Sequence, residues 1–124
     1  MSSHRTLEAW KESRYVSLKL LEVARDHWKP WFASVLEQVV RSATSVQANL
    51  AEGASYGPSP TYTRHLGIAY GSAVETIEFL DLLIEAKALP DGVGEDLLSH
   101  AKRTRILLVG LLKVHRPFKS RPQP

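Results

Sequence analysis

Four segments of the chain repeat apolar residues at intervals of three and four positions, and this spacing constrains the fold more than any other feature. It places the apolar side chains on one face of an α-helix. No segment sustains the alternation of apolar and polar residues that is typical of a strand. Prolines and glycines separate the segments, whose predicted ranges are 6–27, 31–55, 60–88 and 92–115. The sequence therefore predicts an all-α, antiparallel up-down four-helix bundle over residues 1–116 and a basic, proline-containing tail over residues 117–124.

The second and third segments carry the clearest helix signals. Ser34 and Glu37 have the spacing of a capping box, and a start nearer Trp31 is the alternative. Ser59 and Pro60 suit the N-cap and the first turn of the third helix. The apolar stripes expected to be buried on these two helices consist of Leu36, Val39, Ala43, Val46 and Leu50, and of Leu66, Ala69, Ala73, Thr76, Leu80 and Leu83.

The first segment has a less regular pattern. Thr6 is its predicted N-cap. Arg14 and Ser17 interrupt the apolar stripe, so this helix contributes least clearly to a core. The apolar residues of the expected stripe are Leu7, Trp10, Leu18, Leu21 and Ala24.

Charge is distributed unevenly along the chain. The 16 lysines and arginines exceed the 13 acids by three, and from Lys102 onward no acidic residue occurs. A segment of one sign is typical of proteins that bind a polyanion such as nucleic acid. A solvated basic tail that aids solubility is the alternative. The predicted nucleic-acid contacts in this segment are Lys102, Arg103, Arg105, Lys113, Arg116, Lys119 and Arg121.

The second half of the fourth segment, residues 106–112, is apolar on every side. One partner face cannot cover such a helix within a chain of 124 residues. We therefore expect the bundle to assemble with copies of itself, and a denser core within a single chain is the alternative. The predicted oligomer interface consists of Ile106, Leu107, Val109 and Leu111.

Catalysis has little support in the sequence. The chain has no cysteine, no Glu-x-x-His motif and no phosphate-binding glycine loop. Asp96 and His100 lie four residues apart, a spacing that suits a hydrogen bond on a helix surface better than a metal site. The carboxylates of Glu75, Glu78, Asp81 and Glu85 suit a solvated face, or pairing with basic residues of a neighbouring helix. We expect no enzymatic activity, no cofactor and no bound metal.

Two motifs resemble those of a known family. Residues 38–53 read Gln-Val-Val-Arg-Ser-Ala-Thr-Ser-Val-Gln-Ala-Asn-Leu-Ala-Glu-Gly. Residues 62–75 follow the pattern Tyr-x-x-x-Leu-x-Ile-Ala-x-Gly-Ser-x-x-Glu, and residues 7–10 read Leu-Glu-Ala-Trp. This combination resembles the four-helix-bundle proteins encoded in 23S rRNA intervening sequences, over about residues 7–112.

The same family includes the accessory variability protein of diversity-generating retroelements. The resemblance therefore implies a basic, non-enzymatic, pentameric ring that binds RNA or DNA and a reverse transcriptase during mutagenic copying of a template RNA. It also implies that the matching motif residues have structural roles, through polar contacts between helices and glycines that allow close packing. These residues are Gln38, Ser45, Asn49, Glu52, Gly53, Gly71, Ser72 and Glu75.

The chain departs from the family pattern in its cations. Arg41 is retained from an arginine pair and joins the predicted nucleic-acid contacts, but Val40 replaces the first arginine of that pair. Residues 55–57 read Ser-Tyr-Gly where the family carries arginines. Two or three cations are thus missing from the loop after the second helix. The cations that follow residue 101 would have to compensate for them.

Two functions therefore remain in view. The first is a homo-oligomeric nucleic-acid-binding accessory protein of the retroelement type. The second is a structural or protein-interaction ring, encoded in an rRNA intervening sequence, that does not contact nucleic acid. No apolar run approaches the roughly 20 residues needed to cross a bilayer, and the first residues lack the apolar stretch of a signal peptide. We expect a cytoplasmic protein that does not associate with membranes.

Overall fold

The computed structural model describes residues 4–115. Within this range the chain forms four α-helices and two short 3₁₀ turns, and no strand. The helices are α1 (Glu8–His27), α2 (Ala33–Ala54), α3 (Pro60–Glu85) and α4 (Val93–His115), and the turns are η1 (His4–Thr6) and η2 (Pro30–Phe32). The prediction of an all-α chain with four helices is confirmed. The predicted tail at 117–124 lies outside the described residues.

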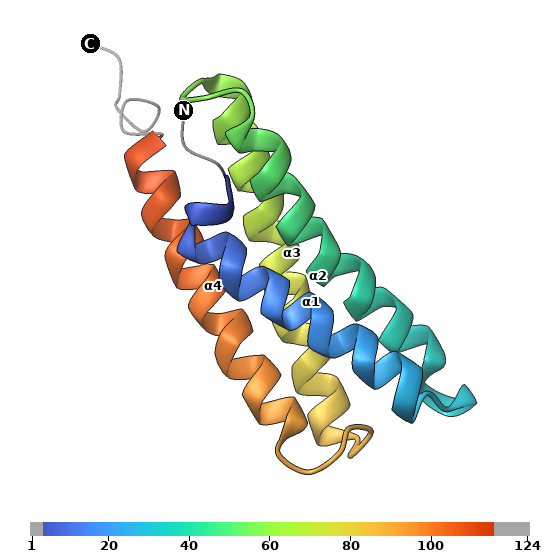
Figure 1. Cartoon of the computed structure of the whole chain (residues 1–124). Helices are drawn as coiled ribbons and strands as arrows, with labels where there is room; N and C mark the ends of the chain where they lie inside the picture. The colour runs from blue at the N-terminus through green and yellow to red at the C-terminus, as the bar shows by residue number, and fades with distance from the viewer. Residues whose placement is uncertain (1–3, 116–124) are drawn as a thin grey trace.

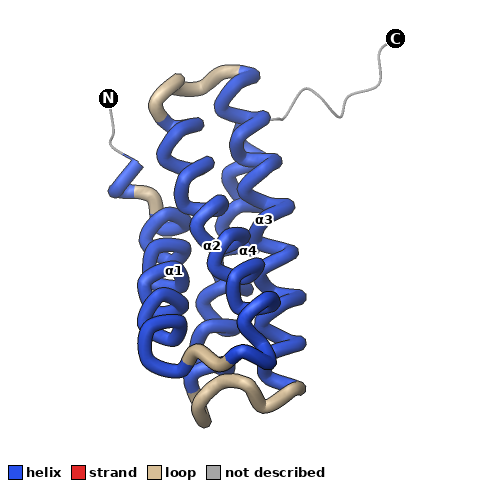
Figure 2. Tube along the Cα trace, turned by 90° about the vertical axis from the view of Figure 1, so that its right-hand side faces the viewer, coloured by secondary structure: helices blue, strands red, loops and turns tan. Residues whose placement is uncertain are grey.

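The four helices form a bundle in which α1 contacts α2 and α4, and α3 contacts α2 and α4. The α1–α2 and α3–α4 connections lie at one end of the bundle (Figure 1). The α2–α3 connection lies at the other end, as the turned view also shows (Figure 2). Residues far apart in the sequence are thereby brought together on two sides, at the α2–α3 contact and at the α1–α4 contact.

Two of the predicted helix starts differ from the structure. Thr6 belongs to η1, and α1 begins at Glu8 after the amide of Leu7 donates to His4 O at 3.0 Å. Because η2 occupies residues 30–32, α2 begins at Ala33, and its N-terminus has no side-chain cap. Ser34 therefore lies inside the first turn, where it cannot form the predicted capping box. Ser59 does cap α3, since its Oγ accepts from the Tyr62 amide at 3.1 Å.

The helix α3 ends at Glu85, three residues before its predicted end at 88, because Lys87 turns the chain into the left-handed region with φ +57°. The Lys87 amide donates to Ile84 O, and the Ala88 amide donates to Leu83 O, each at 2.9 Å. This pair of bonds is the Schellman ending, which usually places glycine at the left-handed position. A lysine occupies it here.

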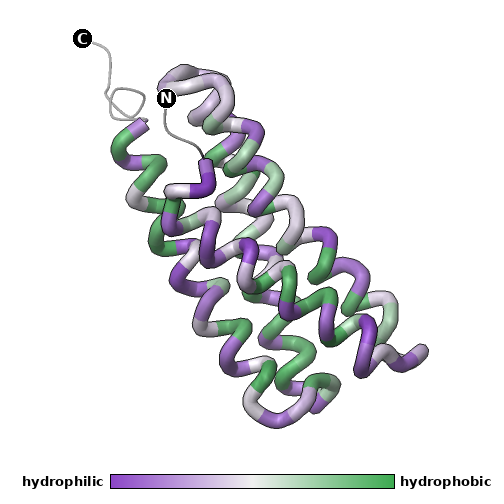
Figure 3. The backbone as a smooth tube through the Cα atoms, in the orientation of Figure 1, coloured by the Kyte–Doolittle hydropathy of each residue, from purple (hydrophilic) through white to green (hydrophobic). Residues whose placement is uncertain are grey.

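The core consists of two clusters, one toward each end of the bundle. Hydrophobic residues recur between hydrophilic ones along every helix (Figure 3). All the residues predicted to be buried on α2 and α3 are buried. On α1 the prediction fails in part, because Leu18 and Leu21 are about half exposed, at 49% and 50%. The buried stripe of α1 instead runs through Ala9, Trp10, Ser13, Val16, Ser17, Leu20 and Val23.

Small side chains explain this difference on α1. Ser17 was expected to interrupt the apolar stripe, but it is buried, and so is Ser13. The Ser13 hydroxyl donates to the Trp10 carbonyl at 2.8 Å, so its burial leaves no donor unpaired. A serine so bonded occupies a core position almost as an alanine does, and hydropathy alone does not reveal it.

Candidate nucleic-acid interface

A row of short polar side chains crosses the contact between α2 and α3. The hydroxyl oxygens of Ser42 and Thr76 lie 2.8 Å apart, and those of Ser45 and Ser72 lie 2.9 Å apart. Ser42 and Thr76 are buried, and Ser45 and Ser72 are half-buried. Buried hydroxyls need such partners, because an unpaired one costs about 1–3 kcal/mol.

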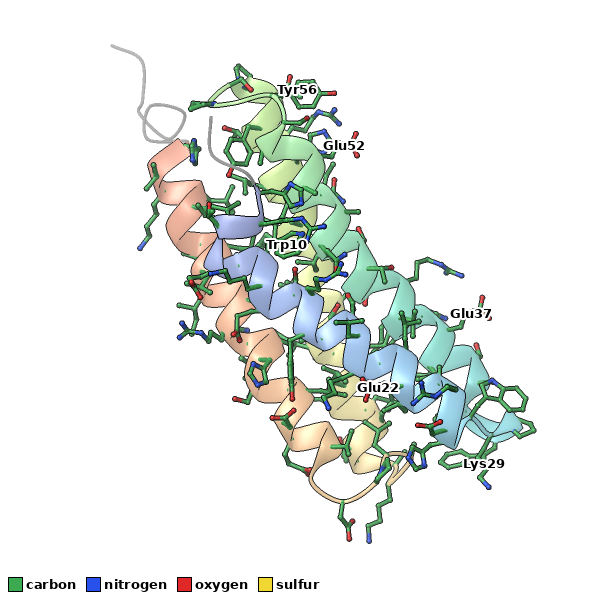
Figure 4. All side chains as sticks on the ribbon, in the orientation of Figure 1. Trp10, Glu22, Lys29, Glu37, Glu52 and Tyr56 are labelled. Atoms are coloured by element: carbon green, nitrogen blue, oxygen red, sulfur yellow. The ribbon has the colours of Figure 1, made fainter. Side chains whose placement is uncertain are left out.

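Asn49 and His65 extend this row. The Asn49 amide nitrogen donates to Ser45 O at 2.9 Å, which turns its Oδ1 toward Nδ1 of His65, also at 2.9 Å. The His65 side chain is only 7% exposed, and its Nε2 lies 3.8 Å from Glu52 Oε2. The Tyr56 ring stacks on His65 with centroids 5.9 Å apart, and Figure 4 shows Glu52 and Tyr56 at this end of α2. The row, from Ser42 to His65, is called the α2–α3 seam below.

Gly53 and Gly71 occupy opposite surroundings. A Cβ at Gly53 would lie 2.7 Å from the His65 Cβ and 3.0 Å from Cδ1 of Tyr62, so only glycine lets α3 approach α2 here. A Cβ at Gly71 would meet nothing within 4 Å, and this residue is exposed in the middle of α3. Close packing inside one chain, expected for both glycines, therefore accounts for Gly53 and not for Gly71.

A second group of polar residues joins α1 to α4. The carboxylate of Glu12 lies 2.7 Å from Nδ1 of His100, whose Nε2 lies 3.5 Å from Asp96. Tyr15 donates to Asp96 at 2.6 Å and packs against the His100 ring with centroids 4.1 Å apart. The bond to Asp96 raises the pKa of Tyr15 above its ordinary value. Among residues 4–115, no cluster of three or more acidic or histidine side chains has a geometry that could hold a metal ion. This group is called the α1–α4 seam below.

The predicted cations differ in whether they have a partner. Arg103 lies 3.8 Å from Glu12, and Arg41 on α2 pairs with Glu37 at 3.1 Å. In the described part of the chain no carboxylate pairs with Lys102, Arg105 or Lys113; the two lysines are exposed and Arg105 is half-buried. Arg116, Lys119 and Arg121 lie outside the described residues.

The acidic residues of α3 also lack a partner in the described part of the chain. Glu75, Glu78, Asp81 and Glu85 are all exposed, and none forms an ion pair within the range 4–115. The pairing with a neighbouring helix that the sequence suggested is therefore not made among residues 4–115. The same helix exposes three apolar side chains, Ile68, Val74 and Leu82. In the described range, these unpaired side chains of α3 are thus negatively charged, whereas the unpaired lysines and arginine of α4 are positively charged.

The four residues predicted at an oligomer interface are only partly buried within the chain. Ile106 points outward and is 66% exposed. Leu107 and Leu111 are half-buried and pack against the core cluster that contains Leu108. Val109 is half-buried as well. The apolar run is therefore partly covered within the chain, and Ile106 is its most exposed member.

A family model for 23S rRNA-intervening sequence proteins matches residues 5–110. The chain belongs to this family. Of the solved structures, the chain is similar to a protein with unknown function from the S23 ribosomal protein family of Bacteroides thetaiotaomicron VPI-5482. The TM-score is 0.74 at 21% identity, over 85% of this chain and 98% of that one, and this similarity supports the fold alone. No curated protein matches the chain.

In this 23S rRNA-intervening sequence protein, the two motifs meet at the α2–α3 seam. Ser45 of the first motif lies against Ser72 of the second, and Asn49 and Glu52 of the first lie at His65. Gln38 and Glu75, by contrast, are exposed and form no side-chain hydrogen bond or ion pair within the described range. Ser42, His65 and Thr76, which are partners in this seam, were not among the predicted site residues. Their positions three or four residues from motif residues on the same helix were the available signal.

In the described part of the chain, none of the helices combines the length and the apolar character that crossing a bilayer requires.

Proposed function

We propose that this protein is a basic, non-enzymatic homo-oligomer of antiparallel up-down bundles that binds nucleic acid. In this proposal it acts, together with a reverse transcriptase, as an accessory factor in retroelement-type mutagenic copying. One observation carries the nucleic-acid part. Lys102, Arg105 and Lys113 on α4 have no carboxylate partner among residues 4–115, although the chain carries 13 acids. Cations without partners are free to exchange their counterions for phosphates.

The distribution of charge supports self-assembly. The outer side of α3 is acidic and that of α4 is basic. Each helix also exposes apolar residues, among them Leu82 on α3 and Ile106 and Val114 on α4. If α3 of one copy faced α4 of the next, opposite charges would surround an apolar centre. Such a contact joins two different surfaces, and a series of them can close into a ring. The exposed Gly71 would then allow the neighbouring helix to approach.

The resemblance described above supports five copies. Five chains of +3 would carry a formal charge of 5 × 3, about +15, and a ring would gather that charge on one body. A field of this size attracts phosphates at low ionic strength and is screened by salt.

Nucleic-acid binding is tested by titrating RNA, DNA and a hybrid duplex at two salt concentrations. If about four cations of a subunit contact phosphates, the logarithm of the affinity should fall with that of salt at a slope of roughly −3 to −4. The double variant K102E/K113E should weaken binding to all three. K11E/K19E is the matched control, because it changes the formal charge by the same amount at two lysines of α1 that pair with Glu8 and Glu22. Absence of binding by the unchanged protein at low salt would refute this part of the proposal.

Assembly is tested by sedimentation at micromolar concentration. The variant I106E should release single subunits, because it places a charge at the centre of the proposed contact. The variant L18E is the control, since Leu18 is also an exposed aliphatic residue but lies on α1, which takes no part in the proposed contact. A compact single subunit of the unchanged protein would contradict self-assembly.

A second candidate is a ring that binds a protein partner and no nucleic acid. The modest charge of +3 and the lack of arginine at residues 55–57 favour it. Purification from the native host would then recover a protein partner without nucleic acid, and the variant R103E/R105E would leave that partner bound. A neighbouring reverse-transcriptase gene, with template and variable repeats, would favour the first proposal instead.

A further inference from the structure

Two exposed tryptophans belong to the α1–α2 connection. Figure 1 shows this connection at the same end of the bundle as the α3–α4 connection. Trp28 is 54% exposed and Trp31 is 65% exposed, whereas the third tryptophan, Trp10, is buried. Indoles are large apolar surfaces that single chains usually cover, so an exposed pair indicates a surface that a partner uses. Neither residue belongs to the two motifs or to the basic segment identified from the sequence.

Only Trp31 of this pair lines a recess between the two connections. Lys29 lies beside it in the α1–α2 connection, and Lys87 faces it from the α3–α4 connection. Figure 4 shows Lys29 at this end of the bundle. The Trp31 ring lies 5.0 Å from that of Phe32, which is buried in the core. The exposed indole therefore packs against a buried ring, and Lys29 and Lys87 line the same recess.

The charge in the recess is positive. In the described part of the chain, neither Lys29 nor Lys87 forms an ion pair. The one carboxylate in the lining, Asp26, is held by Arg25 through two hydrogen bonds of 2.7 and 2.9 Å. Asp91 and Glu95 line a neighbouring recess, which shares Lys87 with this one, but neither carboxylate forms an ion pair with Lys87. The two lysines are therefore left to attract an anion beside Trp31.

The backbone conformation of Lys87 also supports a role for this residue in the recess. Its φ of +57° lies in the left-handed region, where a residue with a side chain is strained and glycine is not. A residue kept in a strained conformation often has a function that its side chain performs. The Lys87 side chain lines the recess.

We propose that this recess binds a nucleotide of single-stranded nucleic acid, with its base stacked on Trp31 and its phosphate held by Lys29 and Lys87. An exposed indole next to cations is the combination that single-strand binding requires, because every base has a stacking face and every nucleotide a phosphate. The bases of a duplex are already stacked on each other and cannot reach the indole. The inference rests on the proposed nucleic-acid binding, and it adds a site at the end of the bundle to the basic side of α4.

The test uses a short single-stranded oligouridylate, an abasic strand of the same length and an RNA duplex. W31A should bind the oligouridylate about tenfold more weakly, which is the expected effect of losing the stacking of one base. It should bind the abasic strand and the duplex as the unchanged protein does. W28A is the matched control, because it removes the same side chain from a position outside the recess.

A second variant separates loss of contact from loss of fold. K87G should raise the thermal midpoint, because glycine relaxes the left-handed position, while it weakens the binding of both single strands. A fall in both quantities would indicate that Lys87 acts only through the fold, and would remove it from the site.

The outcomes distinguish the two proposals. If the unchanged protein binds the oligouridylate and W31A binds it equally well, the recess is not a nucleotide site, while nucleic-acid binding stands. If the unchanged protein binds none of the three probes, the proposed nucleic-acid binding is refuted, and the inference about the recess is refuted with it. If W31A instead dissociates the oligomer in sedimentation, the surface belongs to a second copy and the inference is wrong.

Discussion

The α2–α3 seam and the α1–α4 seam each contain a histidine that bonds to another helix, but they are built from different groups. His65 is 7% exposed at its side chain and bonds to the neutral amide of Asn49. His100 is 31% exposed and bonds to the carboxylate of Glu12. The buried seam thus consists mainly of hydroxyls and an amide, and the more open seam of charges and rings.

The difference follows from the cost of burial. A charge taken out of water loses its hydration unless it is fully paired, whereas a hydroxyl or amide needs only one or two hydrogen bonds. A neutral buried network fixes the register of two helices through its geometry. A half-exposed charged group contributes less, because water and salt screen it. We therefore expect the α2–α3 seam to contribute more than the α1–α4 seam to the free energy of unfolding.

The largest effect is expected for G53A in the α2–α3 seam. The new Cβ would lie 2.7 Å from the His65 Cβ, which cannot move without moving α3. We expect a loss of about 3 kcal/mol in the free energy of unfolding, measured by denaturant titration. The matched control is G71A, whose Cβ meets nothing and which should stabilise an isolated chain by about 0.5–1 kcal/mol. Equal effects of the two variants would contradict the comparison.

N49A should have the next largest effect. It removes the acceptor of His65 and leaves a buried ring nitrogen without a partner. The expected loss is about 2 kcal/mol. The variant T44A is the control, since the Thr44 hydroxyl bonds only to backbone carbonyls of its own helix. Hydrogen exchange of the α2 and α3 amides would locate the change, and a loss confined to α4 amides would disagree with the prediction.

E12A tests the charged seam. The Glu12 side chain is 17% exposed and lies against His100 and Arg103. Its removal should cost about 1 kcal/mol, because both partners can still be hydrated. Urea titrations of E12A and N49A under one condition would compare the seams directly. A larger loss in E12A would reverse the ranking that burial predicts.

The smallest effect concerns pH and Tyr15. The bond to Asp96 raises the pKa of Tyr15 in the folded chain, so the bond favours the protonated hydroxyl. Its contribution is therefore fully present below the ordinary pKa of 10.0 and is lost as the pH rises through the raised folded pKa. The difference in thermal midpoint between the unchanged protein and Y15F should shrink over that alkaline range. A difference that stays constant with pH would show that the hydroxyl bond contributes nothing.

Particular residues show how far sequence reasoning could go at the candidate site. Ser45, Asn49 and Ser72 were predicted from the motif to make polar contacts between helices, and the structure places Ser45 against Ser72 and Asn49 against His65. His65 was not among the predicted site residues, yet it is the residue that Asn49 contacts from 16 positions away. Trp31 and Lys87 come together only because two connections lie at the same end of the bundle. Local patterns do not reveal such pairs.

The sequence by itself determined the four helices, the buried stripes of α2 and α3, and the family, because each of these depends on residues spaced along one helix or one motif. The tertiary structure alone decided which polar groups are partners. Glu12 and His100 are 88 positions apart, and their contact depends on how α1 and α4 are rotated about their own axes. That rotation is fixed by the packing of side chains from all four helices at once. The periodicity of any one helix specifies its rotation only to within about one residue position.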